Sequence, residues 1–254
     1  MKSQKNPVII AQSNGVKEKM TTFIKSFLIN TKDLDEKKIL IKQNESRFVN
    51  QIERSKYIEE LKAALLLICI LMTFGTQLLM DSNIIQVSDF TLKIGNFTWS
   101  GFALANIMHF SYFHLAMNMF ALIFFFNRFF FSDWKMLLSI IILSSVGSSV
   151  FSLIFAPPDS IVIGASGFLF GLMSFYMMYL YDMKKIYDEK SYNTSPLKRF
   201  LLVQGLLCII INFIPQVAWF AHLGGALVGF MMYFLVKNKL DFSYESFVLT
   251  YYKI

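Results

Sequence analysis

Three long stretches of this chain contain no charged residue, and they constrain its fold more than any other feature. Residues 94–127, 160–181 and 200–236 have no Asp, Glu, Lys or Arg. A membrane-spanning helix needs about 20 mostly apolar residues. A soluble domain of 254 residues could not bury this much apolar surface. The uncharged stretches therefore predict an all-α integral membrane protein.

The lengths of the apolar runs predict six membrane-spanning helices. The stretch 94–127 is too long for one span, so we expect an interfacial loop before its helix. Pro215 divides the last stretch, because proline breaks helices. The expected spans are Ala63–Met80, Asn106–Phe126, Met136–Ala156, Ser166–Tyr181 and the two halves of 200–236, which a turn near Asn212–Gln216 separates.

The basic residues predict the orientation. The net charge of +7 would also suit a nucleic-acid-binding protein, but net +4 of it lies in residues 1–60 and the rest gathers in alternate loops. Those loops carry Arg128, Lys135, Lys184, Lys185, Lys190, Lys198, Arg199, Lys237 and Lys239, whereas the opposite loops carry only Lys93. Basic loops face the cytoplasm. We therefore expect cytoplasmic termini, outward-facing segments 81–105, 157–163 and 213–217, and no nucleic-acid partner.

The chain divides into three parts by composition. Residues 1–60 are polar and contain no nucleotide or metal motif, so we expect a small, partly ordered cytosolic segment. Residues 61–240 form the membrane domain, and 241–254 form a short cytosolic tail. Cys69 and Cys208 lie in separate apolar runs, which excludes a disulfide framework. The rich use of Lys, Asn, Ile and Phe suggests a bacterial plasma membrane, with an organelle as the alternative.

All three histidines fall in or at the ends of predicted spans, where polar residues are costly and usually functional. They are His109, His114 and His222. His114 and Asn118 are four residues apart and share one helix face, so both side chains can donate hydrogen bonds to a common point. The alternative is that these histidines are structural residues, hydrogen-bonded between packed helices.

The fourth span opens with Gly164-Ala165-Ser166-Gly167, followed by Gly171. A serine at a helix start lies beside backbone N–H groups that have no intrahelical partner. A hydroxyl and free N–H groups are the parts of a nucleophile with an oxyanion site. The alternative is a helix-packing seam, because Gly167 and Gly171 have the spacing of small residues at membrane helix contacts.

The sixth span carries His222, Gly225 and Gly229 on one face. Glycines at this spacing let a neighbouring helix approach closely. If that neighbour is the Gly167 face of the fourth span, His222 meets Ser166. A buried histidine beside a serine is a nucleophile with its general base.

These motifs together resemble the rhomboid family of intramembrane serine proteases, over about residues 61–240. The resemblance implies a six-helix rhomboid-like bundle and a Ser166–His222 dyad without a third acid. It also implies an oxyanion hole that combines His114 and Asn118 with backbone N–H groups at Ala165 and Ser166. The residues that support the site by resemblance are His109, Gly164, Gly167, Phe170, Gly225 and Gly229.

Two of these positions need comment. Phe170 matches the aromatic residue that packs on the dyad histidine, and some relatives have Tyr there. Many family members carry Trp-Arg in the first outer loop, whereas this chain has Trp99-Ser100. We therefore expect the anchoring of that loop to differ while the dyad is unaffected.

The predicted function is cleavage of transmembrane protein substrates within or near the lipid bilayer, with no cofactor or metal. A metalloprotease is disfavoured because H-E-x-x-H is absent. The main alternative is a catalytically inactive rhomboid-like protein that binds and escorts membrane helices. A small transporter would predict charged residues at mid-membrane or an inverted repeat, and neither is found in the sequence.

Overall fold

The computed structural model describes residues 63–64, 66–129, 134–212, 218–243, 246–247 and 250. The chain divides into two compact units, residues 1–54 and 55–254, and all described residues belong to the second. The cytosolic segment predicted for residues 1–60 lies outside the described residues, as does most of the turn predicted near Asn212–Gln216.

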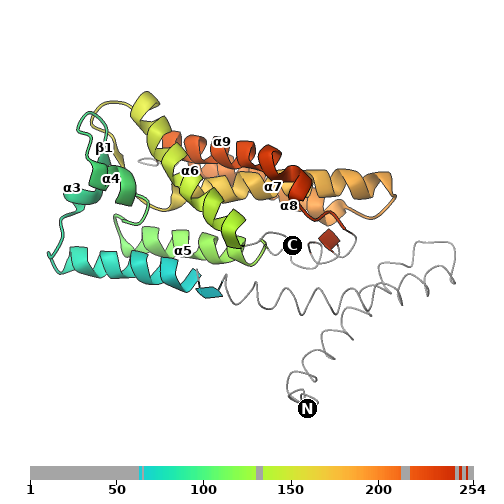
Figure 1. Cartoon of the computed structure of the whole chain (residues 1–254), viewed down its shortest axis with the longest axis horizontal. Coiled ribbons are helices and arrows are strands. Elements are labelled where there is room, and N and C mark those ends of the chain that lie inside the picture. The colour runs from blue at the N-terminus through green and yellow to red at the C-terminus, as the bar shows by residue number, and fades with distance from the viewer. Residues whose placement is uncertain are drawn as a thin grey trace, which may run out of the picture. The chain divides into compact units, whose positions relative to one another are not determined.

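The described part is mostly helical, as predicted, with one short antiparallel ladder that the sequence did not predict (Figure 1). In chain order its elements are the helix Leu66–Asp81, α3 (Val87–Phe90), β1 (Leu92–Lys93), α4 (Trp99–Leu104), α5 (Tyr112–Phe126), α6 (Trp134–Phe155), β2 (Ile161–Val162), α7 (Ser166–Glu189), α8 (Ser195–Asn212), α9 (Trp219–Val236) and the 3₁₀ turn η2 (Lys237–Lys239).

Two of the described helices are long and apolar enough to cross a membrane by length and composition. They are Trp134–Phe155 and Trp219–Lys239, and the described part has two shorter apolar helices, Leu66–Asp81 and Tyr112–Phe126. Large apolar side chains on these helices are exposed, Phe120 at 69% and Leu235 at 77% among them. Such surfaces suit contact with lipid.

Helix α5 begins at Tyr112, six residues after the predicted start. The reason is Ser111, whose hydroxyl accepts a hydrogen bond from the His114 backbone N–H at 3.2 Å and caps the helix. The residues before it form α4 instead, capped in the same way by Thr98, whose hydroxyl accepts from the Gly101 N–H at 3.1 Å. The predicted interfacial loop is thus an ordered segment with its own helix.

The strands β1 and β2 tie this segment to the chain that leads into α7. Leu92 pairs with Val162 and Lys93 with Ile161 in an antiparallel ladder. An ion pair of 3.3 Å between Lys93 and Asp159 adds a further contact. Figure 1 shows α3, β1 and α4 together at one end of the helices. The ladder therefore fixes the backbone immediately before Ser166.

Ser100 occupies the position where many rhomboids have arginine. Its hydroxyl donates to the backbone carbonyl of Asp89 at 2.7 Å, which links α4 to α3. Trp99 beside it is 78% exposed and lies edge-on to Phe97 at 5.0 Å. In this chain a neutral hydrogen bond holds the loop at that position.

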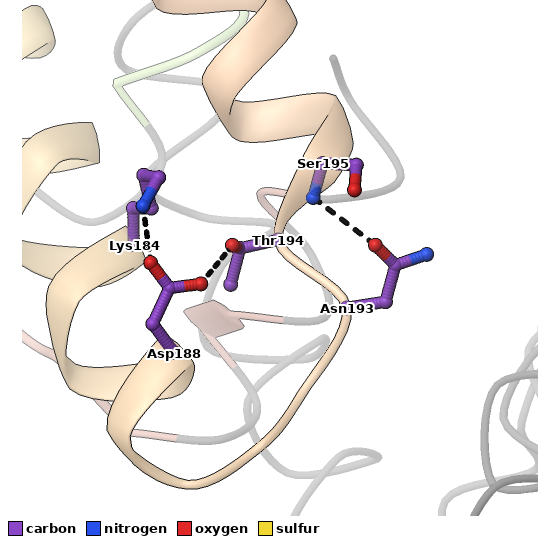
Figure 2. Close-up of polar contacts among 5 residues, drawn as sticks. All are labelled: Lys184, Asp188, Asn193, Thr194 and Ser195. Atoms are coloured by element: carbon purple, nitrogen blue, oxygen red, sulfur yellow. Dashed lines mark hydrogen bonds and ion pairs between the residues drawn. The ribbon is translucent and has the colours of Figure 1, made fainter.

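At its far end α7 continues past the predicted limit of Tyr181 to Glu189 and turns into α8 (Figure 2). Lys184 and the Thr194 hydroxyl both bond the Asp188 carboxylate. The Lys184 hydrogen bond, followed by that of Thr194, holds the pKa of Asp188 below its usual value. The Asn193 side chain accepts from the Ser195 N–H at 3.1 Å. These contacts fix the start of α8.

The described residues of the predicted C-terminal tail pack against α7. The Tyr179 hydroxyl donates to the Asp241 carbonyl at 3.0 Å, and the Phe247 ring stacks on Tyr187 at a centroid distance of 4.0 Å. Phe247 and Thr250 are fully buried. This segment is therefore part of the same hydrophobic core as α7.

Candidate active site

Ser166 is the first residue of α7, and the turn before it requires glycine. Gly164 has a φ of +109°, a backbone conformation that other residues rarely adopt. A Cβ at this position would lie 2.6 Å from Cε1 of His114. The Gly164 N–H donates to the Ala105 carbonyl at 2.8 Å. A residue without a side chain is therefore needed to bring the serine turn against α5.

The structure brings Ser166 and His222 into hydrogen-bond contact. Oγ of Ser166 lies 2.8 Å from Nε2 of His222, and the histidine is only 4% exposed. His222 is held in the first turn of α9, where its N–H donates to the Ala218 carbonyl. The Phe170 ring lies parallel to the imidazole, with centroids 4.1 Å apart and planes 9° apart. This stacking restricts the orientation of the histidine ring.

Glycines let α7 and α9 approach closely enough for this contact. A Cβ at Gly225 would lie 1.9 Å from the carbonyl oxygen of Gly167, and a Cβ at Gly229 would lie 2.0 Å from that of Gly171. Distances below 3.0 Å are not tolerated, so any larger residue would push the helices apart. The seam between the two helices is therefore made of backbone.

Helix α6 packs into the same junction through small residues. A Cβ at Gly167 would lie 2.2 Å from Oγ of Ser148, and one at Gly171 would lie 2.0 Å from Oγ of Ser144. A Cβ at Gly224 would meet the carbonyl oxygen of Gly147 at 2.6 Å. These glycines therefore form a packing seam, and the same seam brings Ser166 against His222.

Asn118 supplies a buried donor beside this turn. It is 7% exposed, and its Nδ2 has no hydrogen-bond acceptor in the part of the chain that the structure describes. A Cβ at Gly164 would lie 2.9 Å from Nε2 of His114 and 3.5 Å from Nδ2 of Asn118. Both side chains thus border the turn that carries Ser166. Buried polar groups are rarely left unsatisfied, and the exceptions call for an explanation.

His109 is completely buried and organises the backbone next to the serine. Its Nδ1 lies 3.1 Å from the Ile107 carbonyl, so this nitrogen carries the proton, and Nε2 accepts from the Ala165 N–H at 3.4 Å. Its ring lies edge-on to His114 at 5.0 Å. The Ala165 N–H, expected at the oxyanion position, is thus directed at His109. The Ser166 N–H has no acceptor among the described residues.

Two polar residues near this site were not predicted from the sequence. Asn106 is buried, and its Oδ1 would lie 3.4 Å from a Cβ at Gly167, close to Ser148. Ser111 positions His114 by capping α5. The signal available for Ser111 was a serine immediately before an apolar run. The described residues hold no group of three or more His, Cys, Asp or Glu side chains that could bind a metal ion.

The sequence model of the rhomboid domain matches residues 96–239, a range that contains every residue of this site. The chain belongs to the rhomboid family. This confirms the resemblance drawn from the motifs, and it places the chain in a membrane-embedded family.

Two relatives from Arabidopsis thaliana illustrate the similarity. RHOMBOID-like protein 6, mitochondrial, is 31% identical over 189 residues, which cover 70% of this chain and 60% of the relative. RHOMBOID-like protein 2 is 29% identical over 184 residues, which cover 68% and 56%. The chain thus spans less than two thirds of the length of these curated relatives.

Proposed function

We propose that this rhomboid is an intramembrane serine endopeptidase that cleaves transmembrane proteins. The observation that carries the proposal is the 2.8 Å contact between Ser166 Oγ and His222 Nε2. It is supported by the Phe170 ring stacked on the histidine and by Nδ2 of Asn118 beside the same turn, which has no acceptor among the described residues. A nucleophile, its base and a hydrogen-bond donor are the components of acyl transfer.

In the proposed mechanism Ser166 Oγ attacks the carbonyl carbon of the scissile peptide bond. His222 Nε2 takes the hydroxyl proton and passes it to the leaving amine as the C–N bond breaks. His222 then deprotonates a water molecule that attacks the ester carbonyl, and it returns this proton to Ser166 Oγ as the ester C–O bond breaks and the carboxylic acid product leaves. The His222 imidazole is neutral at the start of acylation and of deacylation, and it is cationic while it carries the proton within each of these two steps.

The oxyanion that forms in each step needs donors, and four groups are candidates. The His114 and Asn118 side chains border the Gly164 turn, and the Ser166 N–H lies at the start of α7. The Ala165 N–H joins them only if it leaves His109 Nε2, its present acceptor. Each well-placed donor contributes about 10²–10³ in rate.

The proposed topology has six membrane spans, with both termini in the cytoplasm and the Ser166 end facing outward. It rests on the apolar runs and on the basic loops. The proposed location is a bacterial plasma membrane; the plant relatives, one of them named as mitochondrial, make an organelle the alternative. A substrate helix must unwind before its carbonyl is exposed, so small or helix-weakening residues are expected near the cut.

The test is cleavage of a model single-pass substrate by the purified full chain in liposomes. We expect the wild type to cut and both Ser166→Ala and His222→Ala to be inactive. Ser139→Ala is the matched control, because Ser139 is exposed on α6. Cleavage by Ser166→Ala at the wild-type rate would disprove the mechanism. Binding of the substrate without cleavage by the wild type would favour the alternative, an inactive protein that escorts membrane helices.

A further inference from the structure

The helices α7 and α9 also meet at a polar cluster far from Ser166. Asp182 is the first charged residue after the uncharged stretch 160–181. The Tyr233 hydroxyl donates to Oδ2 of Asp182, and Nζ of Lys237 lies 2.5 Å from the same oxygen. Asp182 lies on α7, whereas both partners lie on α9 or directly after it. Every bond of this cluster therefore crosses between the two helices.

Two members of the cluster are largely shielded from solvent. The Asp182 side chain is 14% exposed, and Tyr233 is completely buried. The Phe175 ring meets Tyr233 edge-on, with centroids 5.6 Å apart. A carboxylate in an apolar bundle is costly unless it is paired. Its pairing across the α7–α9 contact therefore ties the two helices to one relative position.

The position of the cluster along the helices is what lets it control the register of α9 on α7. An α-helix rises 1.5 Å per residue, so the sixteen steps from Ser166 to Asp182 place the cluster about 24 Å from the serine. The seam between these points consists largely of glycine backbone, with the hydrogen bond from Ser174 Oγ to the Ala226 carbonyl across it, so it has few side chains to resist sliding or rotation. A slide by one residue, about 1.5 Å, would break the contact of Ser166 with His222.

We propose that Asp182 is a positioning residue, whose bonds to Tyr233 and Lys237 set the register of α9 on α7 and so hold His222 against Ser166. The expected effect of Asp182 on the reaction rate rests on the proposed function. Its expected effect on the register of the two helices does not. Among the ion pairs of the described residues, this is the one that joins the two helices, since Lys184–Asp188 lies within α7 and Lys93–Asp159 precedes it.

The first test measures how fast a fluorophosphonate labels Ser166 in the full chain, at a temperature where every variant is folded. We expect Asp182→Asn to slow labelling about tenfold, because small displacements at a reacting centre have large effects on rate. With a substrate, kcat should fall while KM is unchanged. The matched control is Asp188→Asn, the same change on the same helix with no partner on α9 among the described residues. Equal labelling of Asp182→Asn and wild type, or equal slowing by the control, overturns the proposal.

The second test reads the register without any catalysis. Ser174 Oγ donates to the Ala226 carbonyl at 2.6 Å, so the Ser174 side chain contacts the backbone of α9 at Ala226. In a chain with Cys69 and Cys208 replaced by alanine, Ser174→Cys and Ala226→Cys should form a disulfide under mild oxidation. Adding Asp182→Asn should slow its formation at least about threefold, and an unchanged rate overturns the proposal. An unlabelled wild-type chain would refute the proposed function, and this second measurement would still decide the register.

Discussion

The two ends of the α7–α9 pair are packed by different kinds of residues. We call them the serine end, where Ser166 meets His222, and the aspartate end, where Asp182 meets Tyr233 and Lys237. The serine end is packed through glycine backbone, and a Cβ added at Gly225 would lie only 1.9 Å from the Gly167 carbonyl oxygen. The aspartate end is packed through large aromatic rings and a charged pair.

The two ends meet two different structural requirements, the close approach of Ser166 and His222 and the fixing of α9 relative to α7. The proposed chemistry needs a serine and a histidine on adjacent backbones within hydrogen-bond reach, which excludes bulky side chains between them. Fixing the helices needs directional bonds, which are few in the glycine seam: Ser174 Oγ donates to the Ala226 carbonyl there, whereas the aspartate end adds a hydrogen bond and an ion pair to one carboxylate. The serine end should therefore be sensitive to side-chain volume, and the aspartate end to the loss of charge.

The largest expected effect is a change of volume in the seam. Gly225→Ala places a Cβ 1.9 Å from the Gly167 carbonyl oxygen, so the helices must separate. We expect a loss of about 3 kcal/mol in unfolding free energy and no measurable cleavage. Gly205→Ala on α8 is the control, since its Cβ would meet only Met177 at 3.9 Å. Thermal unfolding in detergent measures the stability of both variants. Equal unfolding midpoints for Gly225→Ala and Gly205→Ala would contradict the close-packed seam.

The next effect concerns the proposed oxyanion donors. Asn118→Ala removes the buried amide beside Gly164, and Asn118→Asp removes its N–H donors while keeping its shape. Both should lower kcat about 10²-fold with little change in KM, because the donors act on charge that develops during the reaction. Steady-state cleavage kinetics measure this. A wild-type kcat in Asn118→Asp would show that the amide does not donate to the oxyanion.

A smaller effect is expected where a ring only orients the base. Phe170→Leu removes the ring that stacks on His222 at 4.1 Å and should slow labelling of Ser166 about tenfold. Phe170→Tyr keeps the ring and should label at nearly the wild-type rate. Equal rates for the Leu and Tyr variants would mean that stacking does not position His222.

The smallest effect lies beyond the aspartate end, at the start of α8. Lys184 and Thr194 hold the pKa of Asp188 below its usual value, so the folded state binds a proton there less readily than the unfolded state (Figure 2). The resulting stabilisation is present above the unfolded pKa and disappears as the pH falls through the folded pKa. Asp188→Asn should therefore lower the unfolding midpoint slightly at neutral pH and not at all in strong acid. A difference that persists in acid would rule out the carboxylate as its source.

Much of this architecture could be predicted from the sequence, because membrane helices must be long, apolar and uncharged. The family and the mostly helical fold are confirmed, and the spacing of His222, Gly225 and Gly229 indicated the face that meets α7. The six-span count and the roles of the site residues stay predictions.

The features that could not be predicted depend on local hydrogen bonds, which a hydropathy pattern does not reveal. The start of α5 was wrong by six residues because one hydroxyl, that of Ser111, caps the helix. The ladder of β1 and β2 was missed because each strand has only two residues. The partner of the Ala165 N–H depends on the tautomer and depth of His109, which no spacing rule specifies.

The most direct test of the account is the site and rate of fluorophosphonate labelling in the full chain, followed by mass spectrometry. The account predicts a single adduct on Ser166, and a labelling rate that falls about 10⁴-fold in His222→Ala because the base is lost. No adduct on Ser166, or an adduct that forms equally fast in His222→Ala, would contradict the claim that these two residues form a catalytic dyad.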